Sequence, residues 1–187
     1  MRWPTFVLGG IAIAVVGIAG WGIWDSHWDP EAKWMDTDRR DCQAWDAFPQ
    51  RNETVTWTGP CRSGKAQGDG VLTWSYTDRT GQAQTETYSG SMLDGKQEGR
   101  GSYVFPNGNR YDGEYRGGNE DGQGVFVWED AKYAGTWKDG QPHGSGVYTT
   151  GDESYEGQWI QGCLDHEGEV ISLRNDDECE SILKKPE

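Results

Sequence analysis

Glycine recurs at fixed distances from an aromatic residue, and this repeat constrains the possible folds more than any other feature of the chain. Five aromatic residues serve as the origins from which the repeat is counted. Glycine is expected at positions +2, +7, +11 and +13 after each origin, and it occupies 19 of these 20 positions. The exception is His166. From the second origin onward the period is 22–23 residues, which indicates stacked copies of one supersecondary unit. The origins are Trp57, Tyr88, Tyr111, Tyr133 and Tyr155.

Within one unit the residues alternate as they do in a β-strand. Tyr111, Gly113 and Tyr115 share one face, while Asp112 and Glu114 point to the other. Asp-Gly and Asn-Gly pairs at 94–95, 107–108 and 139–140 supply the positive φ angles of tight turns. We therefore predict an all-β protein, an elongated single-layer antiparallel meander of hairpins. An insertion near residues 77–87 separates the first unit from the others.

The best-formed unit covers residues 133–148 and reads YAGTWKDGQPHGSGVY, which resembles a repeat of the MORN (membrane occupation and recognition nexus) family. The resemblance extends over residues 57–168, divided into units 57–80, 88–110, 111–132, 133–154 and 155–168. It implies a curved sheet of stacked hairpins with roles in scaffolding, membrane tethering or protein contact, and it implies no catalysis. The last unit departs from the pattern, so we expect it to cap the sheet.

The N-terminus carries an apolar run. Residues 3–24 are uncharged and would reach about 33 Å as a helix, enough to cross a hydrocarbon core of roughly 30 Å. A cleaved signal peptide is the alternative, but Gly17 and Ala19 fit a cleavage site poorly. We favour a transmembrane anchor over residues 1–24.

One face of the expected anchor carries small residues, Gly10, Ala14 and Gly17, which would allow an integral membrane protein to pack closely. Small residues are also common in membrane spans that pack on nothing in particular. Arg2 precedes the run and acidic residues follow it, so the positive-inside rule predicts a single-pass protein of the cell (inner) membrane. Its N-terminus would be cytoplasmic and its C-terminal domain periplasmic.

The net charge of −14 limits the classes of partner. An acidic chain is a poor ligand for nucleic acid, because binding there depends on cations that neutralise phosphates. The same charge opposes binding to anionic headgroups. We therefore expect membrane association through the anchor only, and a protein partner or a second copy at the sheet.

Four cysteines in an exported domain favour disulfide bonds. Three pairings are possible, and proximity in the sequence favours Cys42–Cys61 and Cys163–Cys179. The first pair also resembles the disulfide-tied beginning of exported bacterial MORN proteins. Each bond would contribute roughly 3 kcal/mol in the loop-entropy model.

The flanking segments give weaker signals. Residues 25–56 form a Trp-rich stem, in which Asp29-Pro30 predicts the start of a short helix over about residues 30–46. Residues 169–187 form an acidic C-terminal tail with one expected helical turn near residues 181–183.

No catalytic signature is present in the sequence, neither a nucleophile elbow nor a zinc-protease motif, and we expect no enzyme activity, metal or cofactor. The acidic run at 176–180 lacks the spacing of an EF-hand. A solvated acidic surface explains it as well.

The aromatic face of the sheet is the candidate binding surface. These rings could be the half-core of a single layer, but an apolar face without a second layer also suits a partner. We predict a non-catalytic, membrane-anchored scaffold or accessory subunit of a membrane complex; the alternative is a cell-envelope carbohydrate-binding module. The candidate residues are Trp74, Phe105, Phe126, Trp128, Trp137, Tyr148 and Trp159.

Overall fold

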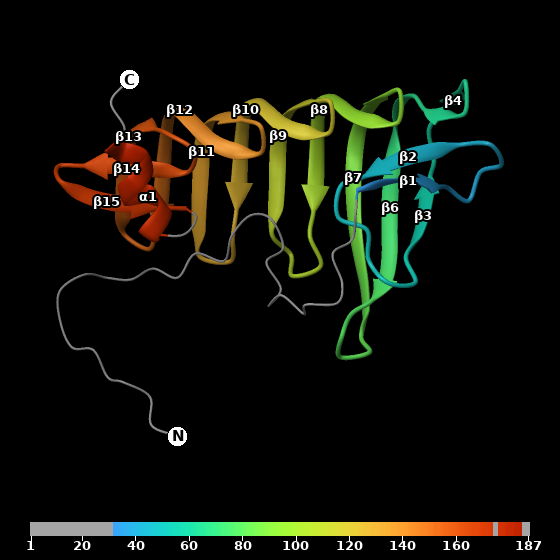
Figure 1. Ribbon diagram of the computed structural model, residues 1–187, viewed down its shortest axis with the longest axis horizontal. Coiled ribbons are helices and arrows are strands. Elements are labelled where there is room, and N and C mark those ends of the chain that lie inside the picture. Colours follow the sequence, from blue (N-terminus) through green and yellow to red (C-terminus); the bar gives the residue numbers. More distant parts are fainter. Residues whose placement is uncertain (1–31, 174–175, 185–187) are drawn as a thin grey trace.

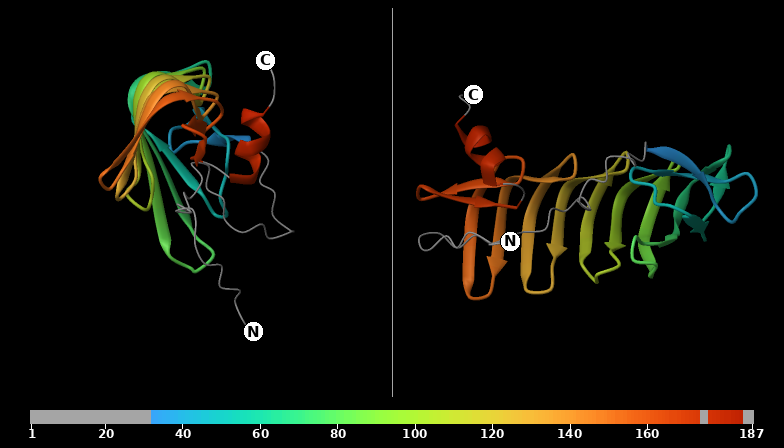
Figure 2. Two further views of the ribbon diagram at one scale, coloured as in Figure 1. Left: turned by 90° about the vertical axis from the view of Figure 1, so that its left-hand side faces the viewer. Right: turned by 60° about the horizontal axis from the view of Figure 1, so that its bottom comes forward.

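A computed structural model describes residues 32–173 and 176–184, and its main element is a nine-stranded antiparallel sheet one layer thick. The strands follow one another across the sheet as a meander, and the sheet curves so that one face is concave (Figures 1 and 2). This confirms the predicted all-β meander. The strands are β3 (Thr54–Trp57), β6 (Gly68–Thr77), β7 (Ala83–Leu93), β8 (Lys96–Val104), β9 (Arg110–Arg116), β10 (Asn119–Val127), β11 (Ala131–Lys138), β12 (Gln141–Thr150) and β13 (Glu153–Trp159).

Glycines of the repeat align in register as one row that crosses the sheet from β6 to β13. Tyr111 shows why: its ring lies over Gly113 and Gly124, where an added Cβ would overlap the ring. The Tyr111 hydroxyl donates to the Glu114 carbonyl at 3.1 Å, which fixes the ring in that position. The glycine pairing thus allows the aromatic origin to lie flat on two neighbouring strands. The row is Gly70, Gly90, Gly101, Gly113, Gly124, Gly135, Gly146 and Gly157.

The insertion after the first unit lengthens the β6–β7 hairpin beyond the lower edge of its neighbours (Figure 1). Its turn is organised by the carboxylate of Asp78. That carboxylate accepts hydrogen bonds from the side chains of Thr80 and Gln84 and from the Gln82 backbone N–H. These bonds lower the pKa of Asp78 to about 2.

The stem forms strands, so the helix expected over residues 30–46 is wrong for its described part. A small second sheet contains β1 (Lys33–Asp36), β2 (Gln43–Asp46), β4 (Cys61–Arg62) and β5 (Lys65–Ala66). Polar residues 37–41 form the connection, and Asp41 adopts a φ of 59°, which an α-helix excludes. We call β1, β2, β4 and β5 the N-terminal strap; the Cys42–Cys61 disulfide, as predicted, joins its two parts.

The other end carries a folded unit, the C-terminal cap, made of β14 (Cys163–His166), β15 (Glu169–Ser172) and α1 (Asp176–Leu183). The predicted Cys163–Cys179 disulfide ties the helix to the hairpin. Leu164 lies against Gly157 of the last strand, which agrees with a capping role for the divergent unit. Residues expected as an acidic tail therefore contain a strand and a helix.

The expected transmembrane anchor, with its face of Gly10, Ala14 and Gly17, lies outside the described residues. Among residues 32–173 and 176–184, no helix is both long enough and apolar enough to span a bilayer.

Candidate interaction surface

Two series of aromatic rings cross the concave face. The first, which we call the upper ladder, consists of aromatic origins and the residues four positions after them. Neighbouring rings meet edge to face with centroids 5.0–5.4 Å apart, a favourable arrangement for aromatic quadrupoles. No ring in it is more than 4% exposed, so this ladder is core. Its members, in spatial order, are Tyr88, Tyr115, Tyr111, Trp137, Tyr133 and Trp159.

The second series, the lower ladder, lies nearer the turns that join β8 to β9 and β10 to β11. Its last member is Tyr155, the last of the aromatic origins. Its centroids are 4.5–6.2 Å apart, and the two ladders touch where Phe126 approaches Trp137. Tyr103, Phe105, Trp128 and Tyr155 are only partly buried and pack against the core. The lower ladder therefore presents aromatic surface. Its members are Trp74, Tyr103, Phe105, Phe126, Trp128, Tyr148 and Tyr155.

The structure places all seven candidate residues in the two ladders but exposes few of them. Five are at most 5% exposed, and only Phe105 and Trp128 keep accessible surface. Tyr103 and Tyr155 were not in the candidate set, although they are accessible members of the lower ladder. The parity of the strands places Tyr103 there, and the lack of a following strand leaves Tyr155 accessible. That these rings bind a partner remains a prediction.

Two buried donor groups in the upper ladder lack an acceptor in the described part of the chain, the Tyr115 hydroxyl and the Trp137 indole N–H. They flank the Tyr111 ring, whose centroid is 5.2 Å from that of Tyr115 and 5.0 Å from that of Trp137. An unpaired buried donor typically costs about 1–3 kcal/mol. Both groups lie inside the core of the sheet, so this cost belongs to the fold itself.

Several carboxyl groups lie close together where the strap meets the sheet, and no sequence motif predicts this cluster. Glu86 accepts hydrogen bonds from the hydroxyls of Tyr76, at 2.7 Å, and Tyr103. Asp46 is 7% exposed, and its Oδ2 has no amide or hydroxyl donor among the described residues. Burial, and then a hydrogen bond with Asp46, raise the pKa of Glu53 to about 8. A proton held on Glu53 gives Asp46 Oδ2 a hydrogen-bond donor.

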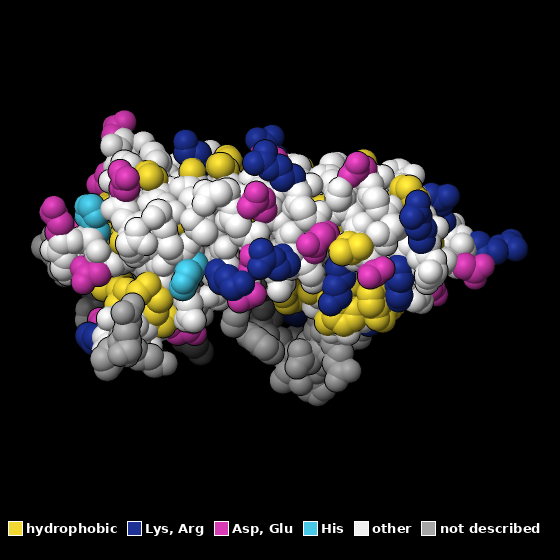
Figure 3. All heavy atoms as spheres, turned by 90° about the horizontal axis from the view of Figure 1, so that it is seen from above, with side chains coloured by type: hydrophobic (Ala, Val, Ile, Leu, Met, Phe, Trp, Pro, Cys, Tyr) yellow, Lys and Arg dark blue, Asp and Glu magenta, His cyan; other side chains and the backbone are white. Residues whose placement is uncertain are grey.

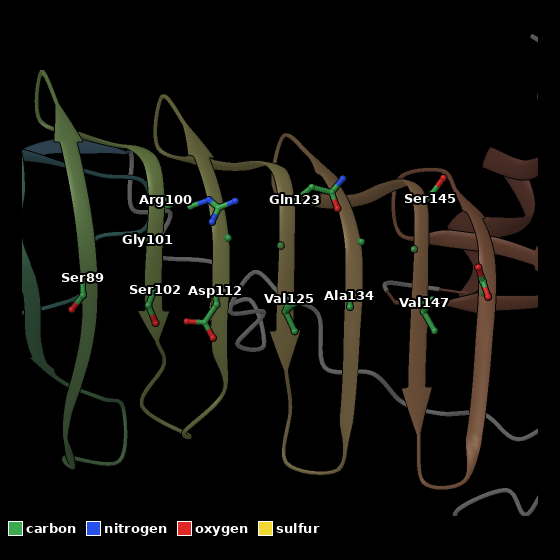
Figure 4. A pocket seen from close by; sticks show the side chains of 15 residues that line it. Ser89, Arg100, Gly101, Ser102, Asp112, Gln123, Val125, Ala134, Ser145 and Val147 are labelled. Atoms are coloured by element: carbon green, nitrogen blue, oxygen red, sulfur yellow. The ribbon is translucent and has the colours of Figure 1, made fainter.

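The convex face is chemically different. A shallow groove follows the glycine row across β7–β13, and the side chains beside it are short or polar (Figure 4). Two of its charged residues have partners on the sheet itself: Asp112 contacts Arg110 at 2.6 Å, and Arg100 lies 4.0 Å from Glu114. No aromatic side chain lines this groove. The apolar recognition surface therefore belongs to the concave face.

Within residues 32–173 and 176–184, no group of histidine, cysteine or carboxylate side chains is arranged to hold a metal ion. The disulfides use all four cysteines.

The geometry defines a class, the single-layer repeat sheet whose glycine-paired aromatics form its own core. The comparison with protein families gives the repeat its name: the MORN repeat matches residues 88–110, 111–130 and 133–154. The chain thus contains three MORN repeats, which generally mediate protein or membrane interactions and are generally non-catalytic. No curated protein matches the chain. The first unit falls outside the match but repeats the geometry, with Trp57 over Gly59 and Gly70.

Proposed function

We propose that this chain is a non-catalytic, membrane-anchored scaffold that holds a partner protein on the concave face of its MORN sheet, as an accessory subunit of a membrane complex. The observation that carries the proposal is the lower ladder, where Tyr103, Phe105, Trp128 and Tyr155 keep accessible ring surface. Partly exposed aromatics on a rigid scaffold are typical anchors of protein interfaces. The strands hold these rings in place, so little conformational entropy is lost on binding.

The membrane part of the proposal is supported by sequence and by covalent chemistry. The uncharged run at residues 3–24 has the length of a membrane span, and acidic residues follow it. Two disulfides in a domain of this size suit an oxidising compartment such as the periplasm. The anchor would contact an integral membrane protein through Gly10, Ala14 and Gly17.

The partner's chemistry follows from the concave face. Apolar side chains would pack on the accessible rings of the lower ladder. Carbohydrate binding has less support, because stacking on a sugar requires an open ring face. Trp137 and Trp159 are each 1% exposed.

The test is quantitative co-purification in mild detergent with an epitope tag after Glu187. Phe105→Ala and Trp128→Ala should each lower partner recovery several-fold, because each removes an aromatic anchor. Val104→Ala and Val127→Ala are matched controls, since Val104 ends β8 and Val127 ends β10, directly before Phe105 and Trp128, and adjacent side chains point to opposite faces. The controls should retain the partner.

Circular dichroism and the thermal midpoint would establish that all four variants are folded. Recovery of a free monomer from the unmodified chain would refute the accessory-subunit proposal. Equal partner loss in the Val104 and Trp128 variants would refute the concave face as the binding surface.

A further inference from the structure

The last strand of the sheet, β13, has an open edge. Its backbone pairs with β12 along Glu153–Trp159, and among the described residues it pairs with no second strand. The C-terminal cap makes its backbone bonds just beyond this strand. Ile160 and Cys163 exchange hydrogen bonds, and the Leu173 N–H donates to the Gly162 carbonyl. In an antiparallel edge strand, alternate residues direct N–H and C=O groups outward, where another chain can pair.

The opposite edge of the sheet is closed by the chain itself. Thr37 forms a parallel bridge with Val55 of β3, and the Asp38 backbone N–H donates to the Val55 carbonyl at 2.9 Å. The Asp38 carboxylate then accepts from the Trp57 N–H at 3.0 Å. In the described part of the chain, the edge of β13 has no such backbone pairing.

Acidic side chains surround the open edge. Residues 151–173 contain six carboxylates and neither lysine nor arginine, and all six are exposed. Figure 3 shows that the charged side chains at the cap end of the molecule are mostly acidic, while basic side chains lie over the middle and the opposite end. Two such edges would repel each other, whereas a basic chain would be attracted. The carboxylates belong to Asp152, Glu153, Glu156, Asp165, Glu167 and Glu169.

Tyr155 adds an apolar contact at the same edge. In the earlier units the aromatic origin lies over two glycines and is buried, but here Leu164 of the cap occupies the place over Gly157. The Tyr155 ring instead stacks on Tyr148 with centroids 6.2 Å apart and meets His166 of the cap edge to face at 5.5 Å, and it remains partly accessible. Its hydroxyl donates to Glu153 at 2.8 Å, so the ring stands beside a carboxylate. Lysine and arginine suit such a pair, because the stem packs on the ring while the cation meets the acid.

We propose that β13 accepts an extended basic segment of a partner protein as a tenth strand of the sheet. Backbone hydrogen bonds along residues 153–157 supply the affinity, and cationic side chains on the two faces of the segment reach Glu153 on one side and Glu156 on the other. This surface shares only Tyr155 with the lower ladder, and the proposal goes beyond the proposed function because it rests on the backbone and carboxylates of β13. Each of the two can therefore fail while the other holds.

The experiment measures binding of the full chain, in mild detergent, to a labelled seven-residue peptide of lysine and valine, with lysines on both faces of the extended strand, by fluorescence anisotropy. Two further peptides carry N-methyl groups on the odd or on the even amides. Because only one set of amides faces β13, one of them should lose at least tenfold in affinity while the other binds normally. A glutamate–valine peptide should not bind.

The protein variant is the double substitution Glu153→Gln/Glu156→Gln, which should weaken peptide binding about five- to tenfold. Glu129→Gln/Asp130→Asn removes the same charge from an exposed turn and should change affinity less than twofold. The proposal is overturned if both N-methylated peptides bind like the parent, because the contact is then charge alone. It is also overturned if the two double variants weaken binding equally. Sedimentation that shows self-association abolished by Glu153→Gln/Glu156→Gln would assign the edge to a second copy instead.

Discussion

The raised pKa of Glu53, which is partly buried beside Asp46, makes stability depend on pH, and Glu53→Gln tests it. In the unfolded chain Glu53 titrates near its ordinary pKa of 4.5, while in the folded chain its pKa is about 8. Between these values the unfolded state releases a proton that the folded state keeps. The contribution of Glu53 is therefore complete below pH 4.5 and is lost progressively as the pH rises to about 8.

The magnitude follows from the same two values. A difference from 4.5 to about 8 corresponds to roughly 5 kcal/mol at about 1.36 kcal/mol for each pH unit. Glu53 is only partly buried, and solvent screening reduces the effect, so we expect a loss of about 2 kcal/mol between pH 5 and pH 8. The side-chain amide introduced by Glu53→Gln would donate to Asp46 Oδ2 at every pH, which removes this dependence.

The assay is guanidinium unfolding followed by tryptophan fluorescence at several pH values, on the full chain in mild detergent. The unfolding free energy of the unmodified chain should fall by about 2 kcal/mol more than that of Glu53→Gln over this interval. Glu129→Gln, at an exposed turn residue, should follow the unmodified chain. If Glu53→Gln shows the same pH dependence as the unmodified chain, the raised pKa of Glu53 is not its cause.

The remaining predictions concern the sheet and its cap. Gly124→Ala should destabilise the fold by about 2–3 kcal/mol, because its Cβ would lie closer than 3.0 Å to the Tyr111 ring. The Cβ of Gly99→Ala would meet no neighbouring atom, so this variant strains only the backbone at a φ of 69° and should lose about 1 kcal/mol of stability. Both variants would be measured by chemical denaturation, and a larger loss for Gly99→Ala than for Gly124→Ala would contradict the ring argument. Cys163→Ser/Cys179→Ser removes the bond across 16 residues and should cost about 3 kcal/mol. Amide exchange should then rise in α1 first, and uniformly faster exchange across β7–β12 would show that the disulfide supports more than the cap.

The sheet could be predicted from the sequence because its determinants are local. The glycine spacing, the strand parity and the turn pairs all lie within one unit, and the register in which Gly113 meets Gly101 and Gly124 follows from them. The stem could not be predicted in this way. Its strands depend on distant contacts, such as the Trp45 N–H donating to the Gly95 carbonyl and the bond from Cys42 to Cys61. Local propensity alone therefore favoured a helix that tertiary contacts override.

The candidate surface was predictable in its composition but not in its exposure. Parity correctly placed the rings on one face, but the burial of each ring depends on the curvature of the sheet and on neighbouring units. Trp137 is buried because Tyr111 and Tyr133 lie on either side of it, at 5.0 and 5.4 Å. The Asp46–Glu53 pair was missed because burial and approach in three dimensions, which no spacing in the sequence records, create it.

The two ladders are formed by different positions of the repeat. The upper ladder consists of origins and of residues four positions later, and its rings are fixed by the glycines beneath them. The lower ladder consists mainly of positions +15 and +17, which no glycine fixes: these are Tyr103 and Phe105 in one unit, and Phe126 and Trp128 in the next. Position +17 even becomes Thr150 in the fourth unit. Phe126 and Tyr148 at position +15 are buried against the upper ladder, whereas Phe105 and Trp128 at position +17 are only partly buried. Position +17 is therefore where such a sheet can acquire specificity for a partner at the smaller cost to its stability.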